Sequence, residues 1–298
     1  MKIAIATDLS KGAVTAAVWG FGHARRLREA GEDVELTLLH SIHSRYPQIV
    51  DTAARLDDPG TRNQLDEEVR KWVGTNIGAN DLDYEVHSLQ GPARDQIPGY
   101  VRQNDVDWLA IGATGRGSLE KLVVGSTSEA IAHDPPCRMS ICHPGHSDWS
   151  DDPSIQVAID FSDPSERALD TAISLARTYG AELDVFHVVQ PPTHGGFPHD
   201  VYEGTELEGV QDLIEMAREE LDSTLEARSG ELESIDWSRE VVSGYPTREI
   251  VDRAESEDHD GVVLGSVGRS AFGDFLIGSV ARGVVKHLPT SVILAPEE

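Results

Sequence analysis

The sequence predicts an α/β protein built as two repeated domains, each a five-stranded parallel sheet sandwiched between helices. Three observations support this class. The chain has 298 residues, which suits two domains that each bury a core. Short apolar runs alternate with helical patterns in both halves, as in parallel sheets covered on both faces. One glycine pattern also occurs twice, which indicates a duplicated domain.

The repeated glycine pattern keeps the same internal spacing in both copies. Gly112-Ala-Thr-Gly115 is followed by nine residues and then Gly125-Ser126. Gly265-Ser-Val-Gly268 is likewise followed by nine residues and then Gly278-Ser279. A polar stretch between two strand-like runs marks the boundary between the copies. We therefore expect a first domain at 1–145, a linker at 146–153 and a second domain at 154–298.

In the first half, five short apolar runs predict strands, and the helix after the first strand is expected to end at Gly31. The last strand of each half is apolar, and an unpaired apolar edge is an aggregation hazard. We therefore expect these last strands to pair, so that the two domains form an intramolecular pseudo-dimer; a homodimer of tandem chains stays open. The expected strands are Lys2–Ala6, Val34–His40, Tyr84–Ser88, Trp108–Ile111 and Arg138–Ile141.

The second half follows the same plan, and its first helix has readable boundaries. Asp163 is expected to cap this helix, Pro164 fits its first turn, and Glu166 completes a capping-box-like pair. Gly180 is placed to end it. The remaining expected elements are strands at Ile155–Ile159, Leu183–Val189, Arg239–Val242, Gly261–Leu264 and Ser291–Leu294, and helices at Val210–Leu225, Thr247–Glu257 and Ser279–Leu288.

The charge balance excludes several classes of partner. The chain has 52 acidic and 25 basic residues and a net charge of −27, which repels nucleic-acid phosphate and anionic membranes. No apolar run approaches membrane-spanning length, and the N-terminus enters a strand without a signal peptide's apolar core, so a cytoplasmic protein is expected. We interpret the acidic excess, which is spread along both halves, as a halophilic surface rather than an acidic recognition face.

A short Cys/His cluster is the candidate metal site of the sequence. It comprises Cys137, Cys142, His143 and His146. The spacing matches no standard zinc pattern, and the second repeat has no cysteine at either position, so we expect a strand running into a loop and no metal. Two cysteines cannot form a disulfide framework in a chain this long, and a reducing compartment is expected.

The repeated glycines lie just after the fourth strand, where ligands bind in open parallel sheets. Gly112 and Gly265 end the strand and can adopt positive φ at no steric cost. Gly115 and Gly268 let a ligand approach the backbone amides, and Gly-Ser then opens a helix whose unpaired amides favour an anion such as phosphate. The alternative is that these are ordinary turn and cap glycines, which the duplication at constant spacing disfavours.

Standard nucleotide motifs are absent from the sequence. The segment Gly112–Ser118 has the length of a P-loop but lacks its lysine, so it is not a Walker A site. No G-x-G-x-x-G follows the first strand, which disfavours a dinucleotide fold.

With these motifs the sequence resembles the ATP-binding type of universal stress protein over essentially its whole length. The pattern G-x-x-G, nine residues, G-[ST] after the fourth strand carries the resemblance. The resemblance implies a Rossmann-like fold of the adenine nucleotide alpha hydrolase-like kind in each domain. Other matching features are Asp8-Leu-Ser10 and Asp160-Phe-Ser162 after strand one, His40 and His187 ending strand two, Gly244-Tyr-Pro246, and Pro289 before the last strand.

The resemblance also implies an adenine-nucleotide site in each domain. Asp8 and Asp160 would hold the adenosine part of the ligand. The residues that would line the adenine pocket or contact ribose are Ser41, Val188, Ile111 and Leu264. Those that would cradle ribose and phosphates are Gly112, Gly115, Gly125, Ser126 and Thr127 in domain one, and Gly265, Gly268, Gly278, Ser279 and Val280 in domain two. Arg116 and Arg269 lie inside the loops and are candidates to pair with phosphate.

The two copies depart from the family pattern in different ways. Domain one has Ala13 where domain two has Ser165, and Gly91-Pro92-Ala93 where domain two has Gly244-Tyr245-Pro246. Domain two has Asp274 where domain one has Lys121, which places a negative charge near the proposed phosphates. We therefore expect unequal sites, with domain one the tighter triphosphate binder.

These features together indicate a nucleotide-responsive regulator of the stress response rather than a metabolic enzyme. A strong hydrolase needs a positioned base and a metal site near the γ-phosphate, whereas the loops offer mainly Gly, Ser, Arg and aliphatic residues, so no catalytic residue is assigned. The expected ligand is ATP or another adenine nucleotide, with Mg²⁺ as an optional companion of the phosphates, and the protein partner is unidentified. Two alternatives stay open: a slow ATPase or nucleotidyl-transferring enzyme, and a nucleotide-free assembly module.

Overall fold

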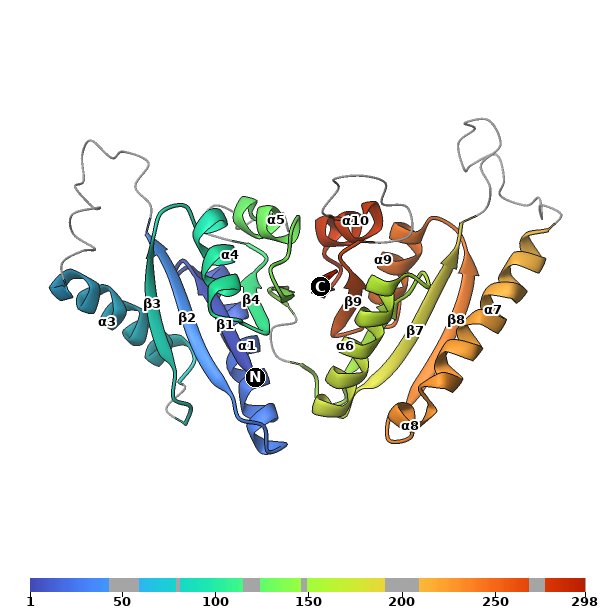
Figure 1. The fold of residues 1–298 in the computed structure, drawn as a ribbon, viewed down its shortest axis with the longest axis horizontal. Coiled ribbons are helices and arrows are strands. Elements are labelled where there is room, and N and C mark those ends of the chain that lie inside the picture. The colour runs from blue at the N-terminus through green and yellow to red at the C-terminus, as the bar shows by residue number, and fades with distance from the viewer. Residues whose placement is uncertain are drawn as a thin grey trace.

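The computed structural model describes residues 1–42, 59–78, 81–114, 124–145, 149–190, 209–267 and 277–297. Within these residues the strands form one ten-stranded sheet in the order β3-β2-β1-β4-β5-β10-β9-β6-β7-β8. The first five strands come from the first half of the chain and the last five from the second (Figure 1). The duplication predicted from the sequence is therefore a duplication of a five-stranded unit.

The strands of both halves lie within two residues of their predicted positions, and neighbours within a half run parallel. Those of the first half are β1 (Lys2–Thr7), β2 (Glu35–Ile42), β3 (Glu85–Gln90), β4 (Trp108–Gly112) and β5 (Arg138–Cys142). Those of the second half are β6 (Ser154–Ala158), β7 (Glu182–Val189), β8 (Trp237–Ser243), β9 (Gly261–Gly265) and β10 (Ser291–Ala295).

The two halves join through their last strands. β5 and β10 pair antiparallel, with Val292 opposite Ile141 and Leu294 opposite Met139. All four side chains are fully buried, so pairing removes two apolar edges at once. The expected pairing of the last strands is confirmed, and we call this junction the seam.

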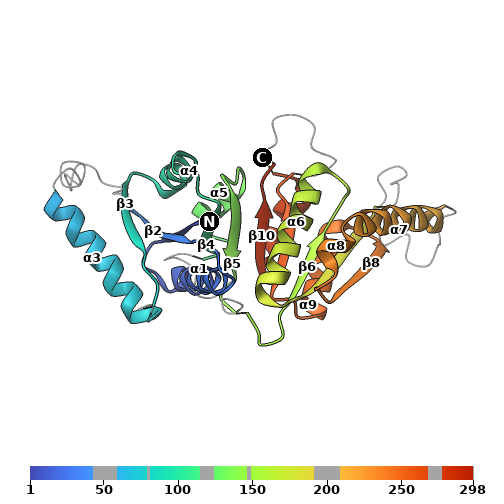
Figure 2. The same cartoon turned by 60° about the horizontal axis from the view of Figure 1, so that its bottom comes forward.

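Helices cover both faces of the sheet, and each face has its own apolar core. Figure 2 shows α1 and α4 on opposite sides of the first-half strands. On the face of α1 lie α1 (Lys11–Glu29), α3 (Pro59–Asn76), α6 (Asp163–Tyr179), α7 (Val210–Ala227) and the short α8 (Ser229–Leu232). On the face of α4 lie α4 (Ala93–Gln103), α5 (Ser126–Ala132), α9 (Pro246–Ser256) and α10 (Ser279–His287).

The N-cap of α6 lies one residue earlier than the sequence suggested. In α6 the N-cap is Ser162, whose hydroxyl accepts from the Ser165 amide in a reciprocal capping box, so the assignment of Asp163 and Glu166 as the capping pair is wrong. Serine supplies both a donor and an acceptor at this position, which the carboxylate of Asp163 does not. The end at Gly180 is confirmed, because this residue adopts φ 65° as a left-handed C-terminal glycine.

Helix α1 ends two residues before the glycine that was expected to stop it. Its last residue is Glu29 and its C-cap is Ala30, while Gly31 follows with φ 89°. Gly31 therefore acts just beyond the helix, where a left-handed conformation turns the chain toward β2.

Candidate functional site

The turn after the first strand of each half has the same unusual backbone. Leu9 and Phe161 adopt φ of 61° and 60°, a left-handed conformation that costs a non-glycine residue energy. The preceding aspartate holds the turn: Asp8 Oδ1 accepts from the amide of Ser10 at 3.0 Å, and Asp160 Oδ1 accepts from that of Ser162 at 3.2 Å. Strained backbone that is retained in both copies marks this turn as a candidate functional element.

A histidine at the end of the second strand ties that turn to the sheet. His40 Nδ1 lies 2.9 Å from the carbonyl oxygen of Thr7, and His187 Nδ1 lies 2.8 Å from that of Ile159. A carbonyl oxygen only accepts, so Nδ1 must carry the proton in both rings. The ring of His187 also packs against Phe161, with centroids 4.6 Å apart. The histidine therefore supports the strained turn from the neighbouring strand.

The first glycine of each repeated pattern is needed for close packing rather than for a left-handed backbone. Neither Gly112 nor Gly265 makes use of its freedom to adopt positive φ. A Cβ on Gly112 would lie 2.3 Å from the carbonyl oxygen of Gly12, and one on Gly265 would lie 2.8 Å from the carbonyl carbon of Pro164. The first turn of α1 or α6 thus rests directly on the end of the fourth strand, and this approach shapes the floor of the site.

The later glycine of each pattern caps a helix without a side chain. Gly125 and Gly278 are the N-caps of α5 and α10, with φ −64° and ψ 147° or 151°. Each donates its amide back to the loop at 2.7 Å, to Ala113 O in the first half and to Ser266 O in the second. No side chain caps either helix. The amides of the first three residues of α10 have no acceptor within the helix and point out of its N-terminal end.

In the second half these elements enclose a cavity of about 520 Å³ at the carboxyl ends of the strands. Every candidate residue of this half that the structure describes lines it: Asp160, Val188, Leu264, Gly265, Gly278, Ser279 and Val280. Gly268 and Arg269 lie outside the described residues. The cavity has the size of a small-molecule site, and residues predicted from four separate segments meet in it.

The described walls of this cavity are apolar with a few polar groups. Ile159, Phe186 and Val189 contribute apolar surface, and Asp160, Glu220 and His187 contribute the titratable groups. The described lining contains no lysine or arginine. Positive potential in this part of the site therefore comes from backbone amides, above all those at the start of α10.

In the first half the candidates occupy the matching positions around β1, β2 and β4. Ile111 is buried at the end of β4, and Ser41 donates its hydroxyl to Gly91 O at 2.6 Å, which fixes the end of β2 against the segment after β3. Ser126 and Thr127 form the first turn of α5, and Ser128 donates to Gly112 O at 2.8 Å. Gly115 and Arg116 lie outside the described residues, as do Lys121 and Asp274.

Sequence reasoning missed the wall that α7 contributes. Leu213, Met216, Ala217 and Glu220 line the cavity of the second half, although they lie far from the glycine pattern in sequence. Met216 is 64% exposed and Leu213 is 39% exposed. Two exposed apolar residues three positions apart on a helix give a weak signal, and it was masked because Leu213 also continues the buried stripe of α7.

The Cys/His cluster contains no candidate metal site within the described residues. Cys137 and Cys142 are buried free thiols. Burial is the main cause that raises the pKa of Cys137 to about 12 and raises that of Cys142 as well, so both stay protonated and are poor ligands. His143 Nδ1 accepts from the Gly145 amide at 3.0 Å, and His146 lies outside the described residues.

Among the described helices, none is both long and apolar enough to cross a membrane.

Comparison with known proteins shows which family the chain is similar to. The family model described as "Universal stress protein family" matches residues 1–143 and again residues 154–296. A universal stress protein of Mycobacterium tuberculosis is 26% identical over 304 residues, covering 98% of this chain and 96% of the relative.

Two solved structures are also similar. A universal stress protein from Archaeoglobus fulgidus has a TM-score of 0.70 at 21% identity, covering 100% of this chain and 98% of that one, which shows the shared fold. A universal stress protein solved in complex with cAMP has a TM-score of 0.36 at 22% identity and covers 50% of this chain and 100% of its own. Because the family model matches nearly the whole chain in two successive segments, the chain belongs to the universal stress protein family as a tandem member.

Proposed function

We propose that this protein binds ATP or another adenine nucleotide in the carboxyl-edge site of each half and acts as a nucleotide-responsive regulator. The observation that carries the proposal is the cavity of about 520 Å³ in the second half, into which the separately predicted residues converge. The adenosine part lies against the apolar wall, with ribose hydroxyls donating to Asp160. The phosphates lie toward Ser279 and the first amides of α10.

The charge of the cavity favours a ligand whose phosphates are held largely by the backbone. Asp160 and Glu220 repel phosphate, so the triphosphate must extend away from them and toward α10. Arg116 and Arg269 are the proposed side-chain partners, and Mg²⁺ is the expected companion of a bound triphosphate. Since Gly278 has an extended backbone with negative φ, a side chain there would project without straining the chain.

A regulatory role is favoured over catalysis by the groups present. The two carboxylates of the cavity are Asp160, which holds the strained turn, and Glu220, which comes from α7. We assign neither carboxylate as the base or water-orienting group that hydrolysis of a γ-phosphate would need. The runner-up is a slow ATPase or nucleotidyl-transferring enzyme, which would release product in a single-turnover experiment. A nucleotide-free assembly module would release no nucleotide when the purified protein is denatured.

We propose further that the halves extend over 1–145 and 154–298 with a linker at 146–153, and that the protein works in a cytoplasm of high ionic strength. The net charge of −27 supports the latter point, because dense surface acid is tolerated where salt screens it.

Isothermal calorimetry with ATP tests the proposed function. Gly125→Val and Gly278→Val combined should abolish the heat of binding, because the valine side chains cover the helix amides while keeping the observed φ. Gly74→Val, at an exposed position of α3 with open space around its Cβ, is the matched control and should bind ATP normally. Unchanged binding in the double variant contradicts the assignment of these helix starts.

A further inference from the structure

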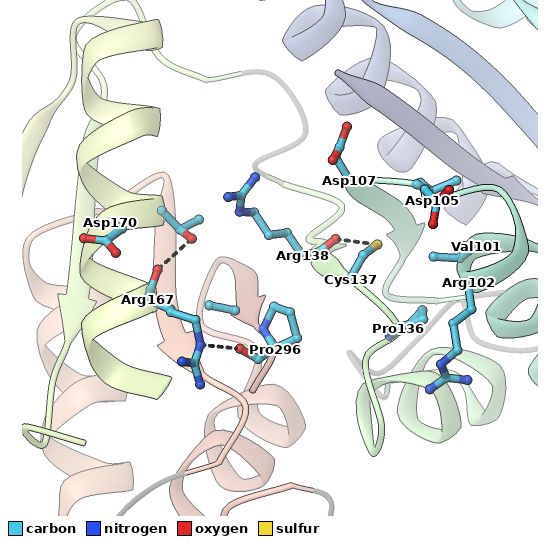
Figure 3. Close-up of a pocket in the computed structure, with 13 residues that line it drawn as sticks. Val101, Arg102, Asp105, Asp107, Pro136, Cys137, Arg138, Arg167, Asp170 and Pro296 are labelled. Atoms are coloured by element: carbon cyan, nitrogen blue, oxygen red, sulfur yellow. Dashed lines mark hydrogen bonds between the residues drawn. The ribbon is translucent and has the colours of Figure 1, made fainter. Parts of the chain in front are cut away.

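A second hollow lies at the seam, away from the nucleotide site. It has a volume of about 500 Å³ and is lined by residues of both halves, including Asp107, Arg138 and Arg167. A neighbouring cavity of about 640 Å³ shares Arg102, Pro136, Arg167 and Pro296 with it. Figure 3 shows Arg138 between α6, which carries Arg167 and Asp170, and the α4–β4 connection, which carries Asp105 and Asp107. We call the two joined cavities the seam groove.

Because the domain is duplicated, an equivalent position exists in the second half, on the other side of the seam. There the linker between the two halves occupies it. Asp260 precedes β9 as Asp107 precedes β4: each donates its amide to the first residue of the first strand and accepts that residue's amide on Oδ2. At Asp260, the linker adds two bonds, from the Ser150 amide to Oδ1 and from the Ser150 hydroxyl to Oδ2, both at 3.0 Å.

The two aspartates also differ in how exposed they are. Asp260 is 5% exposed under the linker, whereas Asp107 is exposed. Within the described residues, Asp107 accepts a hydrogen bond from Lys2 N at 2.7 Å on Oδ2, and no donor to its Oδ1 is seen. One side of the seam is therefore closed by Ser150 of the linker, whereas the equivalent carboxylate on the other side, Asp107, is exposed.

The open side also carries an arginine at a position where the closed side has a serine. Arg138 lies where the second half has Ser291, whose hydroxyl accepts from the amide of His143, just after β5. Of the arginines in the groove, Arg102 pairs with Asp134 at 2.6 Å, while Arg167 donates to the carbonyl of Pro296 at 3.1 Å. Within the described part of the chain, neither Arg138 nor Arg167 forms an ion pair with a carboxylate, and Asp170 is already engaged by Arg228.

We propose that the seam groove binds an extended peptide segment of a partner protein, one that presents a serine or threonine to Asp107 and an acidic side chain to Arg138. The bound segment repeats the contact that the linker makes with Asp260. Its hydroxyl residue donates N–H and O–H to the carboxylate of Asp107, and its carboxylate meets the guanidinium of Arg138. Charge-assisted bonds of this kind give specificity to a small interface, and an interface of this size suits a transient partner.

The linker supplies the probe. A fluorescent peptide of the sequence of residues 143–153 carries Ser150 with Asp148 before it, and its anisotropy is measured while the full chain is titrated in. We expect saturable binding with one peptide per chain. Ser150→Ala in the peptide should weaken binding about tenfold, because bonds to a charged acceptor are lost. Phosphorylation of the same serine should abolish it, because the phosphate meets the carboxylate of Asp107.

Protein variants place the binding in the groove. Asp107→Asn and Arg138→Gln should each weaken binding about tenfold, and their matched controls, Asp83→Asn and Arg248→Gln at exposed positions elsewhere, should leave it unchanged. If Asp107→Asn fails to fold, Arg138→Gln and the two peptide variants still test whether the peptide binds in the seam groove. Absence of saturable binding, or equal binding by groove and control variants, overturns the proposal.

Discussion

Acid should destabilise the fold through one buried histidine at the contact between α1 and α6. His23 of α1 is 2% exposed, and its Nδ1 lies 3.2 Å from the hydroxyl of Tyr179 on α6. Its ring stacks on Trp19 at 4.9 Å and lies parallel to Tyr179 at 5.7 Å. Burial, and to a smaller extent the charges of Arg138 and Arg26, lower the pKa of His23 from 6.5 to about 3.

The sign of the pH effect follows from these values. The folded protein keeps His23 neutral down to about pH 3, whereas the unfolded chain takes up a proton below 6.5. Stability from this residue is therefore complete above pH 6.5 and is lost as the pH falls toward 3. The whole shift corresponds to about 5 kcal/mol, and the part lost by pH 4.5 is about 3 kcal/mol.

Denaturant unfolding between pH 7 and pH 4.5 measures this contribution. His23→Phe keeps a ring in the stack, and His23→Gln keeps a partner for the Tyr179 hydroxyl. Both variants should lose about 2 to 3 kcal/mol less stability over this range than the original protein. Carboxylates that titrate in the same range are shared by all three proteins and cancel in the difference. An equal pH dependence in the original and both variants would refute the reasoning.

Three further results are expected. Burial raises the pKa of Asp184, but bonds from His259 and Arg253 outweigh it and leave the pKa below its ordinary value; stability from this carboxylate is present above about pH 4 and lost below it. Arg253→Leu should cost about 3–5 kcal/mol in urea unfolding, and a cost below 1 kcal/mol would contradict a buried pair. The melting temperature should rise between low and molar KCl, because molar salt shortens screening to about 3 Å; a flat or falling value contradicts the halophilic interpretation. With one site blocked by Gly125→Val or Gly278→Val, calorimetry should show that the first half is the tighter ATP site, and exchanging Lys121 and Asp274 should reverse the order; no change would remove loop charge as the cause.

The sheet was predictable because its signals are local. Apolar runs such as those of β4 and β9 are bounded by glycines, and the repeat fixes their equivalence. The pairing of β5 with β10 followed from a general cost, the exposure of an apolar edge. The Ser162 cap was missed because Asp163 and Glu166 fit the same pattern one residue later, and only the backbone geometry separates the two.

The candidate site was predictable to the extent that its residues follow strands. Asp160, Gly265 and Gly278, which follow or end strands or begin a helix, all line one cavity. The reason for Gly265 was wrong, because the approach of Pro164 joins segments about a hundred residues apart, which no local pattern records. The α7 wall and the contact of the linker with Asp260 were invisible for the same reason: both depend on tertiary packing rather than on propensity.

The two halves can be compared position by position, and the unusual features that they share lie at the carboxyl ends of the strands. Both copies keep a left-handed residue after strand one, a histidine bonded to the carbonyl before it, and a glycine beneath the first helix turn. The left-handed residue costs about 1–3 kcal/mol, and packing alone gives no reason to retain that cost twice. At the opposite, amino edge the copies differ. In the second half Asp184 pairs with Arg253 and His259, whereas in the first half Thr37 occupies the position equivalent to Asp184. We attribute the retained strain to the nucleotide proposed for the carboxyl edge, and we attribute the divergence of the amino edge and of the two sides of the seam to their lying outside that proposed site.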